Sequence, residues 1–503
     1  MPRIYRVADT DRYLLPDLAH ERTKGVHVMT TRIRLRRLGV HPDQDGIEPS
    51  CGLLDVIKDG AVTHRVIVDC GLVPRHDDSG ELQVIPELSS LKDGRPVDLL
   101  LVTHAHWDHA GALPAIVPFL APDAKVAMTT PTARLIRNML EFELQDERAE
   151  DRPRPYAKAH AHELLRRFRI ITKPGCHEML SGLPVHVHPA GHIPGACAFT
   201  VNVAGRKIHW SGDRCEHDQP GVLGAEALPK IWQPDIIAGS DCTYGASPDS
   251  DRHDWHEESE KLANLARETL RQGRRMLIFA FSIHRGGAAA HELQRLDVTA
   301  DGPVFLDGSA RQLTSLLASN RYKWCGQDQP LRLSKIGMIS DHNQRRSVAR
   351  IPTGWCVIAP PGMGGPHGIG CWWRDQLVND PDAVLAFTGF VAPGTDGAKL
   401  LAAAKERDSL GAKSVPISFT ETDRDGHEYE VETALRCQVK QFRLGGHANR
   451  SDTVRWFRGI APQVAVISHG SPAALESIES ELSDMTGTRL VRADREPEVE
   501  IDI

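Results

Sequence analysis

The sequence predicts an α/β layered fold. Short apolar runs typical of strands, such as residues 51–57 and 66–71, alternate in the first half of the chain with longer patterns typical of helices, such as residues 131–144. Strands interleaved with helices of this length favour a layered architecture. Several of the strands also end in a His or an Asp, and a sheet of this kind gathers such residues into one crevice.

Length and composition are those of a water-soluble globular protein with two or three domains. The chain has 503 residues, of which 41% are apolar and 25% are charged. A net charge of −7 argues mildly against a protein that coats nucleic acid, although the 60 Lys and Arg residues leave room for a local basic groove. We find no export signal at the start and no apolar window of about 18 residues, so we expect no membrane contact.

The cysteines indicate a reducing compartment. Ten of them are scattered between Cys51 and Cys437, and no two have the CxxC spacing. This distribution argues against a zinc ribbon and against a dense disulfide framework. We therefore expect the protein to work in the cytoplasm.

The elements before residue 215 follow from periodicity and turn residues. Residues 1–24 have no clear period and form an expected N-terminal extension. The predicted strands lie at 33–35, 51–57, 66–71 and 126–128. The predicted helices lie at 111–120, 131–144 and 156–168, the last two being separated by a charged segment that contains proline.

A loop rich in candidate metal ligands follows the apolar run at 97–102. Four residues within six positions have the required chemistry: His104, His106, Asp108 and His109. Imidazole and carboxylate suit zinc and its first-row neighbours. Alternate residues of an extended chain share a face, so His104 and His106 can bind one ion while the other two reach a second. The alternative is a solvated loop in a chain with 25 His, but the observed order is a much narrower pattern.

Three later strands also end in a candidate ligand, namely His192, Asp213 and His469. Each is weak evidence alone, because a His beside an apolar run is more often structural. Together with the His-rich loop they predict a single metal-binding crevice at the strand ends. Three further histidines fit strand interiors and are expected to be structural: His186, His188 and His209.

Asp69 ends the predicted strand at 66–71 and is followed by a turn glycine at position 71. A carboxylate at this place could orient a metal-bound His from outside the ligand set. It could equally cap the turn. The sequence alone leaves both alternatives open.

The seven candidate ligands resemble the signature of the metallo-β-lactamase superfamily, His-x-His-x-Asp-His followed by a later His, a later Asp and a last His. The resemblance implies an αββα sandwich, in which two sheets pack face to face with helices outside, and a dinuclear zinc site at one edge. It assigns His104, His106 and His192 to the first ion and Asp108, His109 and His469 to the second, with Asp213 bridging.

A second set of motifs resembles the β-CASP family within this superfamily, whose members cut nucleic acids. Residues 240–245 resemble the acidic motif that opens the β-CASP domain, and residues 359–366, 385–390 and 393–395 resemble its closing segment. The run Leu444-Gly445-Gly446-His447-Ala448 resembles its second motif, and His469 its third. The resemblance covers residues 25–503.

The β-CASP resemblance implies an α/β domain inserted into the sandwich. We expect the metallo-β-lactamase domain at 25–245, the inserted domain at 246–409 and the completion of the first domain at 410–503. The insert should begin with a helix at 255–271, which Gly273 ends. It should contain a small parallel sheet with strands at 276–281, 304–306, 356–359 and 384–387.

One segment departs from the family pattern. After the strand at 276–281 the family usually places a Gly-Arg pair with a nearby Gln, whereas this chain has His284-Arg285-Gly286-Gly287. Arg285 and the neighbouring Ser282 are the candidates for substrate contact.

The last histidine of the family signature, His469, is kept. Its presence favours RNA as the substrate, because DNA-cutting relatives tend to lack this residue.

The resemblance therefore implies a zinc-dependent nuclease that hydrolyses RNA, preferably single-stranded. Two Zn²⁺ ions, or Mn²⁺ in their place, would activate a water between them. Asp108 belongs to the catalytic set, and His447, oriented by Asp241, is the candidate donor of a proton to the leaving oxygen. The alternative for His447 is a structural turn residue between glycines and a helix start. A homodimer is left open.

Three other functions compete with this one. The first is a DNA nuclease. The second is a hydrolase of a small ester, thioester or lactam, against which a domain that roofs the site argues. The third is a catalytically silent RNA-processing scaffold, against which the complete set of seven candidate ligands argues.

Overall fold

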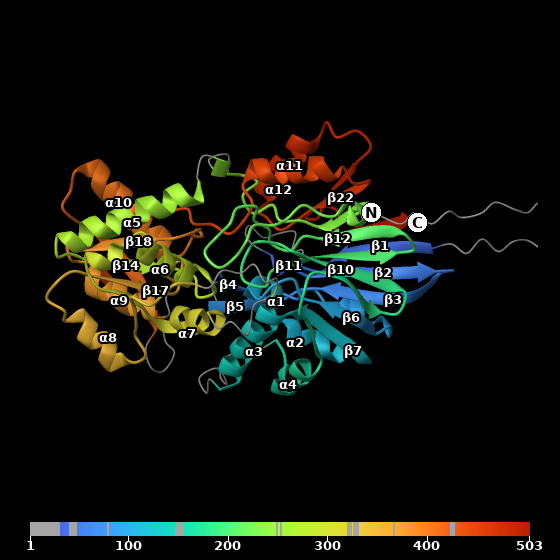
Figure 1. Ribbon diagram of the computed structural model, residues 1–503, viewed down its shortest axis with the longest axis horizontal. Helices are drawn as coiled ribbons and strands as arrows, with labels where there is room; N and C mark the ends of the chain where they lie inside the picture. Colours follow the sequence, from blue (N-terminus) through green and yellow to red (C-terminus); the bar gives the residue numbers. More distant parts are fainter. Residues whose placement is uncertain are drawn as a thin grey trace, which may run out of the picture.

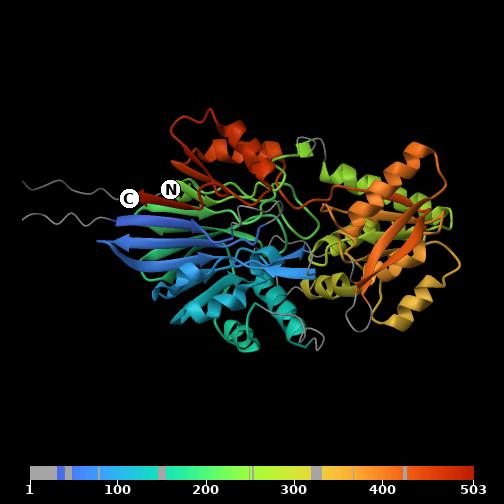
Figure 2. The same cartoon turned by 180° about the vertical axis from the view of Figure 1, so that it is seen from behind.

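The computed structural model describes residues 31–39, 48–77, 80–145, 155–247, 250–251, 254–318, 324, 331–365, 368–422 and 428–503. Its two lobes are visible in both views of Figures 1 and 2, with a sandwich in one lobe and a second α/β domain in the other. The expected N-terminal extension at residues 1–24 lies outside the described residues. In the described part, no helix combines the length and the apolar composition needed to cross a bilayer.

The first sheet of the sandwich has seven strands in the order β24-β1-β2-β3-β6-β7-β8. Strands β24 to β3 are antiparallel, and β3, β6, β7 and β8 are parallel. Their bounds are β1 Thr31–Arg37, β2 Gly52–Lys58, β3 Ala61–Val68, β6 Val97–Leu101, β7 Leu120–Thr129, β8 Phe168–Ile171 and β24 Glu498–Asp502. Between β3 and β6 the chain forms a separate two-stranded hairpin of β4 (Val73–Asp77) and β5 (Gly80–Val84).

The second sheet also has seven strands, in the order β23-β22-β13-β12-β11-β10-β9. Strands β9 to β12 are antiparallel neighbours, and β12, β13, β22 and β23 are parallel. Their bounds are β9 Gly175–Leu180, β10 Leu183–Pro189, β11 Cys197–Val203, β12 Arg206–Trp210, β13 Ile236–Gly239, β22 Val464–Ile467 and β23 Arg489–Arg492.

The two sheets pack face to face around one apolar core. Leu54 and Val66 of the first sheet lie in the same buried cluster as Phe199 and Ile208 of the second. Helices cover the outer faces: α1 (Trp107–Ala110), α2 (Leu113–Ile116), α3 (Thr130–Gln145) and α4 (Lys158–Arg166) on one side, α11 (Arg450–Ile460) and α12 (Pro472–Leu482) on the other (Figure 1). This helix-sheet-sheet-helix arrangement confirms the αββα sandwich expected from the sequence.

The third sheet lies in the second lobe and is parallel throughout, in the order β16-β15-β17-β14-β18-β21. Its strands are β14 Arg275–Phe279, β15 Val304–Leu306, β16 Ile336–Met338, β17 Trp355–Ala359, β18 Val384–Phe387 and β21 Gln438–Gln441. The helices around it are α5 Trp255–Arg271, α6 Arg285–Arg295, α7 Gly308–Leu317, α8 His342–Ala349, α9 Ile369–Leu377 and α10 Asp396–Leu410. Both faces of the sheet are buried, because apolar clusters lie on either side.

Several predicted elements agree closely with this structure. The helix predicted at 255–271 is α5, whose first turn is capped by the Asp254 carboxylate. The helix predicted at 111–120 is instead two short turns, α2 and a 3₁₀ turn at Val117–Phe119, because Pro114 and Pro118 each remove a backbone donor. Other 3₁₀ turns of the described residues include Ser89–Asp93, Lys230–Trp232 and Val298–Ala300.

The chain leaves the third sheet later than the sequence suggests. The expected return near residue 410 is followed by a hairpin of β19 (Val415–Thr422) and β20 (Glu428–Leu435), which packs on α10. Strand β21 then pairs with β18 inside the third sheet. With four residues, of which Val439 is buried, β21 is too short for its periodicity to be recognised in the sequence.

Two connections between the lobes lie at the ends of the third sheet's stretch of the described chain. The chain enters the second lobe between β13 and α5, and comes back after β21, through residues 442–449. Both crossings lie beside strands β13 and β22, which are neighbours in the second sheet. The motif at 240–245 and the motif at 444–448 thus occupy the two connections.

Candidate metal centre

The predicted ligands come together at one edge of the sandwich, where strands of both sheets end. The His-rich loop follows β6, while β10, β12 and β22 are followed by His192, Asp213 and His469 respectively. Three overlapping groups of potential ligand atoms result: His104, His106, His192 and Asp213; Asp108, His109, Asp213 and His469; and Asp213, Asp241 and His447. The geometry predicted from strand ends is thus present in the structure.

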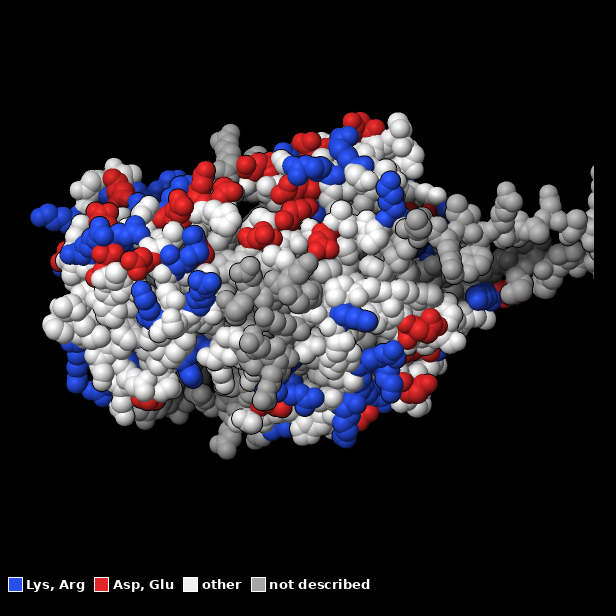
Figure 3. Space-filling view, in the orientation of Figure 1, with Lys and Arg blue, Asp and Glu red and all other residues white. Residues whose placement is uncertain are grey.

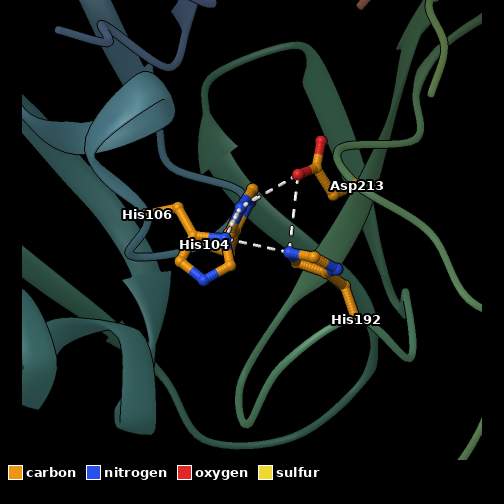
Figure 4. Close-up of side chains that lie close together, drawn as sticks. All are labelled: His104, His106, His192 and Asp213. Carbon is orange, nitrogen blue, oxygen red and sulfur yellow. Dashed lines mark hydrogen bonds and ion pairs between the residues drawn. The ribbon is translucent and has the colours of Figure 1, made fainter. Parts of the chain in front are cut away.

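The first group contains three imidazoles whose nitrogens converge (Figure 4). His106 Nδ1 lies 3.2 Å from His104 Nε2 and 2.9 Å from His192 Nε2. Asp213 completes the group, with its Oδ2 atom 3.5 Å from His104 Nε2 and 3.4 Å from His192 Nε2. His106 therefore faces the common point with Nδ1, whereas the other two use Nε2.

The second group shares Asp213 with the first. Asp213 Oδ1 lies 3.1 Å from His109 Nε2 and 3.1 Å from His469 Nε2. Asp108 Oδ2 stands farther out, 3.7 Å from His109 Nε2 and 3.8 Å from His469 Nε2. Each carboxylate oxygen of Asp213 thus faces one group, which is the geometry of a bridging ligand.

The spacing of these atoms fits a zinc site. Nitrogens bound at the usual Zn–N distance in tetrahedral geometry lie about 3.3 Å apart, close to the separations in the first group. Asp213 Oδ1 is buried and accepts no hydrogen bond from the described residues, although two histidine nitrogens are near it. A buried carboxylate oxygen without a donor is costly unless a cation satisfies it. The donor set therefore suits a metal rather than a hydrogen-bond network.

Burial controls the charge of these imidazoles. It lowers the pKa of His106 and of His192 well below the usual range, with neighbouring histidines adding to the effect. Burial also opposes charge on His109, but Asp213 and Asp108 outweigh it and raise the pKa of His109. Neutral imidazole is the form that binds metal, so His106 and His192 are ready ligands.

A shell of hydrogen bonds orients the imidazoles from behind. Asp69 Oδ2 accepts from His109 Nδ1 at 2.8 Å, and Thr103 donates its backbone N–H and its hydroxyl to the same carboxylate. His469 Nδ1 lies 3.1 Å from the Ser50 hydroxyl. Such contacts fix the tautomer and orientation of a ligating His. Of the two alternatives for Asp69, the contact with His109 is the one present.

Asp69 and the ligand candidate His469 have backbone conformations uncommon for side chains with a Cβ. Asp69 has φ 63° and His469 has φ 50°. Non-glycine residues in this region cost of order 1 kcal/mol or more and gather at functional sites. The sequence analysis did not identify Ser50 or Thr103 as site residues, because a hydroxyl beside a strand end carries no distinctive pattern.

The pair predicted for proton transfer is also formed. His447 Nδ1 donates to Asp241 Oδ2 at 2.9 Å, and Asp241 further accepts from the Arg214 and Thr243 backbone N–H groups and from the Thr243 hydroxyl. His447 Nδ1 lies 3.9 Å from Asp213 Oδ2, so the pair borders the ligand groups. Burial disfavours charge on His447, but Asp241 outweighs it and raises the pKa of His447 to about 9.

The residues predicted to touch substrate lie outside the three ligand groups. Arg285 is 6% exposed, and its Nη1 atom donates to Gln219 Oε1 at 2.9 Å. Ser282 is partly exposed to solvent, and its hydroxyl lies 2.7 Å from that of Ser309. Substrate contact by either residue stays a prediction.

Two of the three histidines expected to be structural, His188 and His209, form hydrogen bonds away from the ligand groups. His209 Nδ1 lies 2.8 Å from the Thr200 hydroxyl, and His188 Nε2 donates to the Glu226 carbonyl at 2.7 Å. Burial lowers the pKa of His186, of His188 and of His209. None of them belongs to a ligand group of the described residues.

Comparison with protein families gives two matches. Residues 64–277 match the beta-lactamase superfamily domain, and residues 432–493 match the Zn-dependent metallo-hydrolase RNA specificity domain. The first match includes the whole His-rich loop, His192 and Asp213. The second includes His447 and His469, so the two families between them contain every predicted ligand.

Curated relatives match most of the chain. Cleavage and polyadenylation specificity factor 73 of Drosophila melanogaster is 22% identical over 424 residues, which are 81% of this chain and 56% of that protein. The RNase J-like protein of Methanocaldococcus jannaschii is 25% identical over 416 residues, 81% of this chain and 87% of that protein. Transcription termination factor FttA of Methanothermobacter thermautotrophicus is 25% identical over 433 residues, 81% of this chain and 63% of that protein. The chain thus spans little more than half the length of the Drosophila relative.

A solved structure shares the fold. It is the crystal structure of a protein of unknown function from Enterococcus faecalis V583, with a TM-score of 0.52 and 12% sequence identity. The match covers 95% of this chain and 100% of that one. The likeness therefore extends over both lobes.

Proposed function

Because the chain belongs to the metallo-β-lactamase superfamily and, within it, to the β-CASP nucleases, we propose that it is a zinc-dependent ribonuclease. Its substrate is RNA, preferably single-stranded, and the bond that it hydrolyses is a phosphodiester. Relatives whose names describe endoribonucleases or an RNase J-like protein support this proposal. Its domains are the sandwich and an inserted β-CASP domain that extends to the end of β21.

The observation that carries the proposal is the position of Asp213 between two sets of histidines. Its oxygens lie 3.1 to 3.5 Å from His104, His109, His192 and His469. A carboxylate shared in this way is suited to hold two cations at the short separation of two-metal hydrolases. Two Zn²⁺ ions, or Mn²⁺ in their place, would activate a water and neutralise charge on the phosphate when bound there.

The residues beside the ligands supply the rest of the chemistry. The imidazole of His447 bears a proton and lies at the border of the ligand groups. Asp241 fixes this ring by accepting a hydrogen bond from its Nδ1 atom. The opposite nitrogen, Nε2, is left to donate a proton to the leaving oxygen of the cleaved bond. Asp241 is itself fixed by two backbone N–H groups, so the orientation of His447 does not depend on a mobile carboxylate.

On the one face drawn in Figure 3, charge is mixed rather than strongly basic. Lys and Arg are interspersed there with Asp and Glu on both lobes. Affinity for RNA that came mainly from phosphate contacts would need a denser basic surface than this one. We therefore expect binding to depend on local contacts near the ligand groups and to be only moderately sensitive to salt.

The nine cysteines of the described residues form no disulfide. Cys176 is exposed, and an exposed free thiol would be at risk of oxidation in an oxidising compartment. We therefore propose the cytoplasm as the place where the protein acts. A polymer of RNA is its natural substrate there.

Digestion of end-labelled RNA and DNA by the purified protein tests the function. We expect discrete internal cuts in single-stranded RNA, no cuts in DNA of the same sequence, and loss of cutting after the zinc is removed by a chelator. RNAs with a 5′-monophosphate and a 5′-hydroxyl should be cut equally if the enzyme is an endonuclease. Cleavage of DNA alone, or of a small ester alone, would replace the proposal by one of its alternatives.

A further inference from the structure

Arg285 joins the inserted domain to the sandwich through a buried contact. It is the first residue of α6, and its guanidinium donates from Nη1 to Gln219 Oε1 at 2.9 Å. The preceding residue, His284, donates from Nε2 to the Pro220 carbonyl at 2.8 Å and has φ 67°. Two consecutive residues of the second lobe thus bind two consecutive residues of the loop after β12.

Gln219 extends this contact to a predicted metal ligand. Its side-chain amide nitrogen donates to the Gly191 carbonyl at 2.9 Å and to the His192 carbonyl at 3.2 Å. Gln219 is 5% exposed, so water does not compete for these bonds. One amide therefore connects the guanidinium of Arg285 with the backbone that carries His192.

The same residues hold the loop that precedes His447. His192 Nδ1 donates to the Gly446 carbonyl at 2.6 Å. Gly446 leaves no room for a side chain, because a Cβ atom there would lie 2.6 Å from Arg285 Nη2 and 2.9 Å from the His192 carbonyl oxygen. Gly446 is thus packed between Arg285 and His192, one residue before the proposed proton donor.

Burying a guanidinium between two domains costs free energy, because the charged group loses its hydration. Among the described residues no carboxylate forms an ion pair with Arg285, and burial lowers its pKa. Apolar side chains of similar volume would join two domains at a lower cost. Arg285 lies between His284 and Gly286 in sequence, and the amide that accepts its hydrogen bond comes from Gln219 in the other domain.

We propose that Gln219 and Arg285 are positioning residues for the proposed nuclease. From opposite domains, they hold His192 and the loop that carries His447 at a fixed position relative to each other. The inference rests on the proposed function for its catalytic readout. Neither residue touches the reacting atoms: Gln219 acts through the backbone of His192, and Arg285 acts through Gln219 and Gly446. The inserted domain is then part of the catalytic apparatus and not only a cover.

Two pairs of variants test this role. Gln219→Leu removes the amide at nearly constant volume, and Gln219→Glu keeps an acceptor for Arg285 but loses the donor to the Gly191 and His192 carbonyls. Arg285→Met removes the guanidinium, and Arg285→Lys keeps the charge and a donor. Arg295→Met is the matched control, because Arg295 lies at the other end of the same helix with a side chain that is 47% exposed.

Cleavage kinetics give the first readout. We expect Gln219→Leu and Arg285→Met to lower kcat at least tenfold while KM changes less than threefold. The reason is that His192 and His447 lose their relative position, whereas the surface that binds RNA is kept. Arg285→Lys should recover part of the loss, and Arg295→Met should cleave like the wild type. Wild-type kcat in folded Gln219→Leu and Arg285→Met would overturn the proposal.

Zinc release gives a second readout that does not use RNA. A colorimetric chelator should remove zinc from Gln219→Leu and Gln219→Glu at least fivefold faster than from the wild type, in the phase that belongs to the group containing His192. Release from Arg295→Met should be unchanged. Unchanged release from both Gln219 variants would overturn the proposal, whereas failure of the wild type to cut RNA would count against the nuclease function alone.

Discussion

His447 Nδ1 lies 2.9 Å from Asp241 Oδ2, although the two residues stand on separate connections between the lobes. Asp241 follows β13 at the exit from the sandwich, and His447 follows β21 at the return. A carboxylate that accepts from one imidazole nitrogen fixes the ring and leaves the other nitrogen for proton transfer. The pair is therefore formed only when both connections are in place.

Replacement of His447 by Ala should slow cleavage and leave the zinc content unchanged. General acid catalysis by a placed side chain contributes about 10²- to 10⁴-fold, so kcat should fall within that range. His447 is not among the seven predicted ligands, which is why zinc should remain. Metal analysis of the purified variant beside single-turnover cleavage measures both quantities. Loss of zinc together with activity would mean that His447 is a ligand instead.

The double variant Asp108→Ala with His109→Ala should lose cleavage altogether. Both residues belong to the second ligand group, whereas the first group keeps its three histidines and Asp213. We expect about one zinc ion per chain in place of two, since one group stays intact. The control is Asp123→Ala with His162→Ala, which removes an exposed residue pair of the same types. Retained cleavage in the test variant would exclude the two-metal proposal.

Asp69→Asn should weaken zinc binding without abolishing it. The carboxylate holds the Nδ1 side of His109 and is itself held by Thr103, so its loss frees the imidazole to rotate. Replacing a partner of this kind typically costs about 10- to 100-fold in metal affinity. Competition with a chelator of known affinity measures the effect, and Asp123→Asn is the exposed control. Equal affinity in the two variants would contradict the orienting role.

His209 should make the folded protein sensitive to mild acid. Burial, with smaller contributions from His188 and Arg214, lowers the pKa of His209 to about 3, whereas a free imidazole titrates near 6.5. Between these values the unfolded chain binds a proton that the folded chain does not, so stability falls as the pH drops below about 6.5. The stability lost through this residue between pH 7.5 and pH 5 is about 2 kcal/mol.

Urea unfolding of wild type and His209→Gln at these two pH values measures the effect. The variant should be less stable at pH 7.5, because the Thr200 contact and the packing of the ring change. Its further loss at pH 5 should be smaller than that of the wild type. An equal loss in both proteins would show that His209 is not neutral in the folded state.

Much of the fold could be predicted because the signals are local. The helix α5 is marked at its start by Asp254 and near its end by Gly273, and its bounds agree with the prediction. Strand β21 could not be predicted, because it takes its place from pairing with β18 rather than from its own four residues. The expected domain boundary near residue 410 therefore lies before this strand.

The candidate site divides in the same way. The His-rich loop and the strand-end residues could be identified because ligand chemistry and spacing are visible in sequence. Ser50 and Gln219 could not, because their roles depend on partners far away along the chain: Ser50 and His469 are 419 positions apart. A hydroxyl or an amide has no preferred spacing that reveals such a partner in advance.

The two connections between the lobes have a mechanical consequence. Any rotation of the inserted domain must bend the chain in these two connections, one of which carries Asp241 and the other His447. Both residues are also fixed to the sandwich, because the Ala448 backbone N–H donates to the Arg214 carbonyl and the Cys242 backbone N–H donates to the His469 carbonyl. A movement of the inserted domain can then bend the chain on the far side of these anchors, so that the proposed proton donor and its carboxylate stay together while the two lobes move.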